Sequence, residues 1–573
     1  MTFAFGSFAP LKQLNRNTLE RVQAILLGLA LVGAGWLAIV APTPPAPLPA
    51  GAPPGEFSSE RALVHVRAIA QAAHPLGSPE NAAVRRYLSA QLSALGLAVG
   101  VQSFAWQQTE PNGFNLMARI PGTSTTNEPV RAVALVCHHD SVPTGPGAGD
   151  DGAAVAALLE TARALKAGPA LRNDVLLLFT DGEEAPGDVP GARAFANRCP
   201  WMKDIGCVFN FDARGVSGPV LMYETSAGNG PLIREFAAAT PRPVANSLMS
   251  ELYRHMPNDT DFTAFKQAGV PGLNFVFIGG AQHCHQPTDD VAHLDLRSLQ
   301  QEGSHALSLA RHFGNLDLAR LHGTDAVYFD LLGRVLIHYP SAWAIPLALM
   351  ATVLFIGGTW FEIKRGEASP WKLALAWLGW GVNLLVVGAL FRYGPDLVVR
   401  LAHGAPVWLA RLQMWPYWFL ALGLTVAVST TLHLVLRNWL GPKNLALGAL
   451  WWWLLLAIAG AFWMPGGSFL GLWPLLFGLV GVLAISRERK RPWRQHLWLA
   501  VTGLPTIILV APLMHECYVG LGPRGVFVPM LSLVLVLGAL SLQAEAISRA
   551  WKWTLPVAGL LVALAAVVSS FGK

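Results

Sequence analysis

The chain has 573 residues, of which 53% are hydrophobic and only 13% are charged, and its mean hydropathy is +0.41. Soluble domains usually carry about 25% charged residues, so this composition argues against a purely soluble protein and indicates a membrane protein. The net charge of +6 gives no reason to expect nucleic acid as a partner. Five cysteines are too few for a disulfide framework, and Cys199 and Cys207 either pair or are two separate buried thiols.

The N-terminal segment is short and basic and leads into an apolar run. Ala24–Val40 is long enough to cross a bilayer, and a cleaved signal peptide is the competing interpretation. The proline-rich stretch Pro42–Pro54 has no strong small-residue cleavage pattern, although two alanines within it leave room for cleavage. We therefore expect a cytoplasmic N-terminus over residues 1–22 and an uncleaved transmembrane anchor over residues 23–41.

Residues 42–335 have the pattern of a separate α/β domain. Apolar runs rich in β-forming residues predict six strands: Phe114–Ile120, Ala132–Cys137, Val175–Thr180, Val208–Phe211, Val220–Tyr223 and Leu273–Ile278. Helical periodicity predicts seven helices: Ser58–Ala73, Ser78–Leu95, Ala153–Lys166, Pro190–Asn197, Pro231–Ala239, Asp261–Ala268 and Asp295–Phe313. Strands that alternate with helices predict a mainly parallel or mixed sheet with helices on both faces.

Residues 336–573 read as a membrane domain of about eight transmembrane helices. The expected spans are Ala342–Phe361, Leu373–Phe391, Trp415–Leu436, Leu445–Trp463, Phe469–Ile485, Leu497–Met514, Val526–Leu542 and Trp553–Ser570. If the N-terminus is cytoplasmic, the loops on the cytoplasmic side carry most of the Lys and Arg, as the positive-inside rule requires. This bias places the α/β domain and Lys573 on the non-cytoplasmic face.

Ionisable residues are few within the predicted spans, and His433 is the clearest of them. Ion-coupled transporters generally need several buried charged groups near the middle of the membrane. The membrane domain is therefore expected to serve as an anchor, a substrate-presenting surface or an assembly platform. The segment Leu397–Leu412 is either an amphipathic helix along the outer interface or an ordinary loop.

Five short segments of the α/β domain carry candidate metal ligands, and the first two precede the helix at Ala153. In the first, an apolar strand ends in His138-His139-Asp140. A histidine that binds a metal needs its second ring nitrogen held by an acceptor, which a carboxylate two residues later can provide. In the second, Asp150 and Asp151 follow small residues that permit a tight turn. A carboxylate here could bridge two cations, and a helix N-cap is the alternative; we expect Asp150 in the metal role and Asp151 in the cap role.

The third segment follows the strand Val175–Thr180 and contains Asp181, Glu183 and Glu184. Three carboxylates at the end of a buried strand are costly unless a positive charge neutralises them. Two adjacent glutamates can also have different roles: one can bind the metal, and the other can act as a general base toward a metal-activated water. A solvated acidic loop is the alternative for this segment taken alone.

The fourth and fifth segments complete the set. Asp212 ends another apolar strand, and His283-Cys284-His285 follows the last strand by a short loop. The carboxyl ends of parallel strands meet in one crevice, so these side chains are expected to converge. A set of His, Asp and Glu ligands is typical of a catalytic zinc pair rather than a closed thiolate site. The residues of the fifth segment leave open which histidine binds.

These motifs resemble those of the co-catalytic di-zinc aminopeptidases of the bacterial leucyl aminopeptidase and aminopeptidase Y type. The resemblance runs from about residue 58 to residue 315, keeps all five motifs in order, and includes the entry segment His74–Ser78. Within the family the chain is most similar to the membrane-embedded branch of endoplasmic reticulum metallopeptidase and vacuolar membrane protease. Asn258–Phe262, Ala268–Gly272 and the run of apolar spans are typical of that branch. The fold that this implies is a zinc-exopeptidase-like mixed sheet.

The resemblance also implies a role for each motif residue. His138 and Asp212 would bind one zinc ion, Glu184 and His285 the other, and Asp150 both; Glu183 would be the general base and Asp140 would orient His138. His139 departs from the family pattern and is interpreted as a neighbour of the ligand. His285 is preferred to His283 because it stands four residues before Asp289, as in the family's His-x-x-x-Asp pattern.

The expected function is a membrane-bound zinc aminopeptidase that removes N-terminal residues from peptides, with two zinc ions per chain. The alternatives are a glutaminyl cyclase-like aminoacyltransferase, which would use one zinc, and an inactive receptor or scaffold. We expect peptide substrate and the lipid bilayer as partners. The location is expected to be a bacterial inner membrane with the domain in the periplasm, or else the lumenal side of a eukaryotic organelle. The sequence leaves the oligomeric state open.

Overall fold

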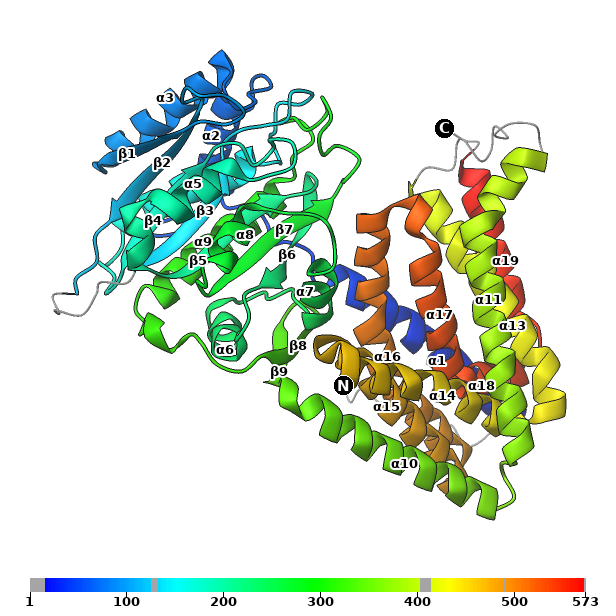
Figure 1. Ribbon diagram of the computed structural model, residues 1–573. Helices are drawn as coiled ribbons and strands as arrows, with labels where there is room; N and C mark the ends of the chain where they lie inside the picture. Colours follow the sequence, from blue (N-terminus) through cyan, green and yellow to red (C-terminus); the bar gives the residue numbers. More distant parts are fainter. Residues whose placement is uncertain (1–15, 125–131, 402–413, 489–490, 571–573) are drawn as a thin grey trace, which may run out of the picture. The chain divides into compact units, whose positions relative to one another are not determined.

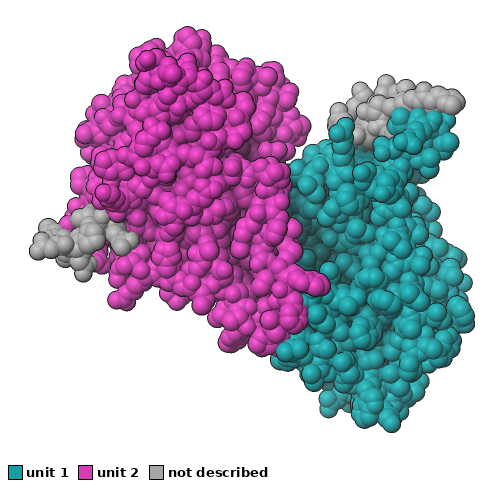
Figure 2. Space-filling model, in the orientation of Figure 1, with its two compact units in different colours: residues 1–39, 347–459, 470–573 teal, residues 40–346, 460–469 magenta. Residues whose placement is uncertain are grey.

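The computed structural model describes residues 16–124, 132–401, 414–488 and 491–570, and it divides into two compact units (Figures 1 and 2). The helical unit is formed by residues 1–39, 347–459 and 470–573. The α/β unit is formed by residues 40–346 together with residues 460–469. One short segment from the second half of the chain thus belongs to the α/β unit.

A seven-stranded mixed sheet forms the centre of the α/β unit, in the order β1-β2-β4-β3-β5-β7-β6. Its strands are β1 Val99–Phe104, β2 Gly113–Ile120, β3 Ala132–His138, β4 Asp174–Thr180, β5 Ile205–Ala213, β6 Ser217–Thr225 and β7 Gly272–Gly279. The four central strands, β4, β3, β5 and β7, run parallel to one another. The other pairs are antiparallel: β1 with β2, β2 with β4, and β6 with β7. Purely apolar sequences suit the central strands because both of their faces are buried.

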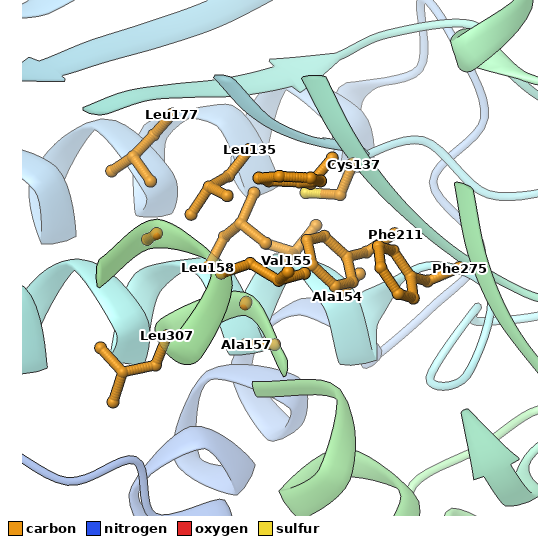
Figure 3. Close-up of a cluster of buried hydrophobic side chains, with 14 of the residues drawn as sticks. Leu135, Cys137, Ala154, Val155, Ala157, Leu158, Leu177, Phe211, Phe275 and Leu307 are labelled. Carbon is orange, nitrogen blue, oxygen red and sulfur yellow. The ribbon is translucent and has the colours of Figure 1, made fainter. Parts of the chain in front are cut away.

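Helices cover both faces of this sheet, as the alternation of strands and helices predicted. They are α2 Ser59–Ile69, α3 Pro79–Ala94, α4 Gly152–Lys166, α5 Pro190–Arg198, α6 Gly230–Ala239, α7 Ser247–Tyr253, α8 Asp261–Gln267 and α9 Leu296–Phe313. Side chains alternate across a strand, so Leu135 and Cys137 of β3 pack with α4 and α9, while Ala134 and Val136 pack with α5 and α8. Figure 3 shows the first of these clusters around Val155.

Four elements of the α/β unit were not predicted. β1 lies at the edge of the sheet, and only Phe104, its last residue, is buried. α7 has seven residues, too few to establish a helical period. The strands β8 Ala326–Leu331 and β9 Val335–Pro340 form a separate two-stranded sheet just before the first helix of the second half.

Every span predicted after residue 336 coincides with one or two helices. These are α10 Ala344–Lys364, α11 Pro370–Leu401, α13 Met414–Leu440, α14 Pro442–Trp463, α15 Ser468–Arg487, α16 Pro492–Leu521, α17 Phe527–Ala539 with α18 Ser541–Ala550, and α19 Thr554–Ser569. Most of the segment Leu397–Leu412 lies outside the described residues, as does Lys573.

Among the described residues, seven helices are long and apolar enough to cross a membrane, including Thr18–Val40 of α1 (Arg16–Val40). The count becomes eight if α17 and α18, which bend by 69° at their junction, form one span. α19 is apolar but shorter. The chain is therefore a membrane protein. Whether α17 and α18 together form one span changes the number of times it crosses the membrane.

The ionisable side chains of the helical unit are paired where they are buried. Lys443 Nζ lies 2.9 Å from Oε2 of Glu362, which has no exposed surface. Arg437 Nη1 lies 3.0 Å from Glu545 Oε2, and His433 Nε2 lies 3.6 Å from the same oxygen. Pairing offsets part of the cost of removing such charges from water.

All five cysteines, which lie in the described part of the chain, are free thiols. The disulfide interpretation of Cys199 and Cys207 is therefore wrong, and the interpretation as two separate thiols holds. Cys207 is fully buried in β5, whereas Cys199 follows α5 and its Sγ lies 3.9 Å from Sδ of Met117.

Candidate metal centre

Five acidic and imidazole side chains from distant parts of the sequence meet at the carboxyl ends of the central strands. His138 is the last residue of β3, Asp212 lies one residue before the end of β5, and Glu184 follows β4 by a short turn. Asp150 precedes α4, and His285 lies in the loop after β7. The parallel direction of β3, β4, β5 and β7 brings these ends to one edge of the sheet.

The two carboxylate oxygens of Asp150 face two different histidines. Asp150 Oδ1 lies 3.2 Å from His138 Nε2, and Asp150 Oδ2 lies 3.2 Å from His285 Nε2. Glu184 Oε1 lies 3.0 Å from the same His285 nitrogen, and Asp212 Oδ1 lies 3.9 Å from His138 Nε2. Asp150 thus stands between a His138–Asp212 pair and a His285–Glu184 pair.

Burial and like charge make this cluster costly without a cation. Burial, followed by the charge of Asp150, raises the pKa of Glu184 to about 7 and that of Asp212 to about 7. Among the described residues, two groups can each hold a metal ion: His138 with Asp150 and Glu184, and Asp150 with Cys284 and His285. The nitrogen and oxygen donors fit zinc, and a cation would neutralise the buried carboxylates.

Asp140 touches His138 in two ways and also supports the acidic turn after β4. His138 Nδ1 lies 3.0 Å from the backbone oxygen of Asp140 and 3.5 Å from its carboxylate Oδ1. Either contact leaves Nε2 of His138 directed at Asp150 and Asp212. The Asp140 carboxylate accepts the N–H groups of Glu183, at 3.1 Å, and Glu184, at 3.2 Å. One side chain therefore orients a histidine and also positions both glutamates.

Glu183 is half-buried beside Glu184 at the same edge of the sheet. Burial raises the pKa of the Glu183 carboxyl well above its usual range, and the charge of Asp212 adds to the effect. A carboxyl with a raised pKa can hold a proton near neutral pH, as a general acid–base group must.

Three other residues of the predicted motifs face elsewhere. His139 is buried, with Nε2 3.0 Å from the backbone oxygen of Phe114. His283 Nδ1 lies 2.9 Å from Thr288 Oγ1, and His283 belongs to neither of the candidate metal groups among the described residues. Asp151 occupies the N-cap position of α4, but in the described structure its side chain makes no capping bond. Its Oδ2 instead accepts the N–H of His138, at 3.2 Å, because the carboxylate points back toward β3.

Asp289 has a structural role that its sequence position did not reveal. Its Oδ1 accepts the N–H of Gly149 at 2.7 Å, and its Oδ2 accepts the N–H of Asp150 at 3.2 Å. These bonds hold the backbone from which the Asp150 carboxylate projects. The spacing of His285 and Asp289 singled out this residue, but it could not show which backbone the carboxylate would reach.

The loop before α4 needs its glycines, as its small residues suggested. Gly147 has φ +62°, and a Cβ there would lie 2.5 Å from the backbone oxygen of Asp150. A Cβ on Gly149 would lie 2.4 Å from the backbone oxygen of Gly215. Any side chain at these two positions would displace the backbone that carries Asp150.

The α/β unit, with its cluster of histidine and carboxylate ligands, has the architecture of a metallohydrolase, here in a chain that also carries membrane helices. Residues 115–310 match the model of peptidase family M28.

Relatives with the same type of domain include membrane proteins. Endoplasmic reticulum metallopeptidase 1 of Mus musculus is 27% identical over 369 residues, which is 58% of this chain and 40% of the relative. The vacuolar membrane protease of Candida dubliniensis is 27% identical over 256 residues, which is 44% of this chain and 26% of the relative. The chain thus spans less than half the length of either. A Zn-dependent exopeptidase from Parabacteroides distasonis superposes with a TM-score of 0.37 and 17% identity, over 45% of this chain and 98% of that one.

Proposed function

We propose that the chain is a membrane-bound zinc metallopeptidase of the aminopeptidase type, hydrolysing N-terminal residues of peptides. The observation that carries this proposal is the position of Asp150, with one carboxylate oxygen 3.2 Å from His138 and the other 3.2 Å from His285. A carboxylate placed between two imidazoles, each with a second acidic neighbour, suits a pair of cations. The match of residues 115–310 to the model of peptidase family M28 supports the same reaction class.

The residues present fit two zinc ions. His138 and Asp212 would hold one, Glu184 and His285 the other, and Asp150 would contribute one oxygen to each. Bound zinc lowers the pKa of water toward about 7 and polarises a carbonyl group. The Asp140 contact to Nδ1 keeps Nε2 of His138 available as a ligand atom.

Glu183 is the group that we propose to move the proton. Its carboxylate accepts a proton from the attacking water and returns it to the nitrogen of the leaving amine, so that the peptide C–N bond breaks and the balance of protons is kept. The raised pKa of Glu183 suits both directions of transfer. Asp140 holds the backbone of Glu183 in place during these steps.

We further propose that the α/β unit lies on the non-cytoplasmic face of its membrane, in a bacterial periplasm or in the lumen of a eukaryotic organelle. The excess of Lys and Arg in the predicted cytoplasmic loops supports this orientation. A peptide would then be cut outside the cytoplasm.

The test compares the detergent-purified full-length protein with its Glu183→Gln variant on a panel of aminoacyl chromogenic substrates, with zinc counted in both. We expect the native protein to release the chromophore, the variant to lose at least about a hundred-fold in rate, and both to hold about two zinc ions. Two zinc ions without release would redirect the search to endopeptidase, dipeptidase or cyclase substrates. About one zinc ion per chain, with cyclisation but no peptide hydrolysis, would favour the glutaminyl cyclase-like alternative. The absence of zinc from both proteins would favour an inactive scaffold.

A further inference from the structure

The loop after β7 brings a thiol to the metal centre beside His285. Cys284 Sγ lies 3.5 Å from Asp150 Oδ2, the carboxylate oxygen that also lies 3.2 Å from His285 Nε2. One donor atom from each of these three residues lies within 4.8 Å of the other two. Small side-chain movements would bring all three to the about 2.0–2.3 Å of bonds to zinc. Cys284 is half-buried and forms no disulfide, so its sulfur is free to bind.

Cys284 and His285 are consecutive residues, yet both side chains face the same carboxylate. In an extended segment, consecutive side chains point to opposite sides. His285 instead has φ +59°, in the left-handed region that residues other than glycine rarely adopt. Its backbone oxygen accepts a hydrogen bond from Thr144 Oγ1 at 2.9 Å, which fixes the loop against the segment that leads to Asp150. The turn at His285 thus keeps a sulfur and a nitrogen donor on one side of the loop.

The third donor of this short motif, His283, is held away from the centre. Its Nδ1 lies 2.9 Å from Thr288 Oγ1, and its ring lies 4.6 Å, between centroids, from that of His293. Among the described residues, it belongs to neither of the groups that can hold a metal ion. The structure therefore brings Cys284 and His285 to the centre, whereas the sequence had left the choice between the two histidines.

The thiol completes one of the two groups of metal donors in the described structure. One group is His138, Asp150 and Glu184, and the other is Asp150, Cys284 and His285. Glu184 Oε1 also lies 3.0 Å from His285 Nε2, so this carboxylate is placed near both groups. Catalytic zinc sites usually have three protein ligands and one open position. Cys284 is the residue that gives the second group a third donor of its own.

A sulfur donor would change the chemistry of the site. Thiolate is a soft ligand that favours zinc, whereas carboxylate oxygens and water suit magnesium, calcium and manganese. A metal ion deprotonates a thiol that coordinates it, and the proton passes to the solvent. The alternative is a neutral thiol that donates a weak hydrogen bond to Asp150 and never touches the ion.

We propose that Cys284 is a sulfur ligand of the metal ion that Asp150 and His285 hold, and that it makes this site selective for zinc over manganese. The inference rests on the proposed function, because it concerns one of the two ions proposed there. The ion at His138 would have only nitrogen and oxygen donors, so the two ions would differ in their chemistry.

Cobalt reports a sulfur ligand directly. The full-length protein in detergent is stripped with a chelator, loaded with excess Co²⁺ and desalted, and its near-ultraviolet absorption is recorded. We expect a sulfur-to-cobalt charge-transfer band, which nitrogen and oxygen donors alone do not produce, and we expect Cys284→Ser to lose it. Cys199→Ser is the matched control and should keep the band, because Cys199 is also a half-buried thiol but has Met117 as its neighbour, at 3.9 Å.

A parent protein that binds cobalt without this band would overturn the proposal. A band that persists in Cys284→Ser would also overturn it, because the sulfur would then belong to another thiol. The spectrum needs no turnover, so a band in a protein that hydrolyses no peptide would uphold the ligand and contradict only the proposed activity. Peptide hydrolysis by a cobalt-loaded protein without the band would do the reverse.

The unmodified chain allows a second measurement, which does not depend on the folding of a variant. Alkylation by iodoacetamide, followed by mass spectrometry, compares Cys284 with Cys199 in protein that holds zinc and in chelated protein. We expect zinc to slow the alkylation of Cys284 at least about ten-fold, because a coordinated thiolate is not free to attack, and to leave Cys199 unchanged. An equal rate at Cys284 with and without zinc would overturn its role as a ligand.

Competition with a chelator tests the selectivity of the site. Cys284→Ser should lower the affinity for zinc at least about ten-fold, since even groups that only support a metal ligand contribute that much. Its affinity for manganese should stay close to that of the parent, because oxygen donors suit this metal. Equal losses for the two metals would contradict the selectivity, and an unchanged zinc affinity would contradict the ligand.

Discussion

The backbone N–H of Glu183 donates a hydrogen bond to Asp140 Oδ1 at 3.1 Å, so the proposed base is held by the residue that also orients His138. The second oxygen of Asp140 accepts the N–H of Glu184 at 3.2 Å. Asparagine keeps only one oxygen, and its amide would point N–H groups at a backbone donor. We therefore expect Asp140→Asn to disturb the ligand and the base together.

The expected result for Asp140→Asn is a loss of about 10- to 100-fold in zinc affinity or in kcat/KM, the usual effect of removing a group that supports a metal ligand. Chelator competition and steady-state kinetics on the same preparation measure both quantities. Asp204→Asn is the control, because Asp204 forms a partly exposed ion pair with Arg119. Equal behaviour of the two variants would contradict the role of Asp140.

Asp289 offers a second test, because it holds the backbone of Gly149 and Asp150 without being a proposed ligand. Asp289→Asn replaces one of the two acceptor oxygens with an amide and should displace Asp150. We expect zinc affinity to fall about ten-fold, as for other groups that orient a ligand. Asp290→Asn is the neighbouring control, since that side chain bonds instead to His293 in the same loop. If both variants bind zinc as tightly as the parent, Asp150 does not need its backbone to be held by Asp289.

The stability of the metal-free protein should depend on pH through Glu184 and Asp212. Their pKa values are raised to about 7 from ordinary values of 4.5 and 3.8, first by burial and then by the charge of Asp150. Because the folded values lie above the unfolded ones, protonation stabilises the fold. That contribution is complete below about pH 4 and is lost as the pH rises through about 7. Each unit of pKa shift corresponds to about 1.4 kcal/mol.

We therefore expect chelated protein to lose Tm between about pH 5 and about pH 8, and the increase in Tm on adding zinc to grow over the same range. Thermal unfolding in detergent, with and without zinc, measures this directly. The double variant Glu184→Gln/Asp212→Asn should lose part of the pH dependence in the chelated state, while Glu183 and Asp261, whose pKa values burial also raises, keep the rest. A zinc effect of constant size at every pH would mean that these carboxylates are not the groups being neutralised.

The topology of the membrane helices can be tested at the bend between α17 and α18. Reporter fusions after residue 335 and after Lys573 should both report a non-cytoplasmic location if α17 and α18 together cross the membrane once. A non-cytoplasmic signal at residue 335 with a cytoplasmic signal at Lys573 would show that the bent pair, or the short helix α19, does not cross. A cytoplasmic signal at residue 335 would contradict the proposed orientation of the α/β unit.

The buried ion pair between Lys443 and Glu362 predicts an asymmetric response to mutation. Glu362→Ala removes the fully buried partner of Lys443 but leaves Glu367 Oε2 3.3 Å from the ammonium, so it should destabilise the helical unit by less than the about 3–5 kcal/mol expected for a fully unpaired buried charge. Glu362→Ala/Lys443→Met removes both charges and should recover much of that loss. Unfolding of the detergent-solubilised protein followed by circular dichroism compares the two. A double variant less stable than Glu362→Ala would contradict this account of the pair.

Much of the α/β unit could be predicted because its central strands are buried on both faces and therefore apolar throughout. β3 and β5 end in, and β4 leads into, residues that would be costly in an apolar setting, so the strand and the candidate ligands were recognisable together. The edge strand β1 and the short helix α7 carry weaker signals. β1 buries only its last residue, and α7 completes barely two turns.

The sequence by itself determined the class of the protein: apolar strands that contain or lead into His138, Glu184 and Asp212, followed by a run of apolar helices. These are local signals, because a strand, a membrane span or a motif consists of residues that are consecutive in the sequence. Only the tertiary structure decided which backbone Asp289 holds, where Asp151 points, and that Gly466 touches α7. Such contacts join residues far apart along the chain, and the energy of a hydrogen bond between them depends on a distance that no local pattern encodes.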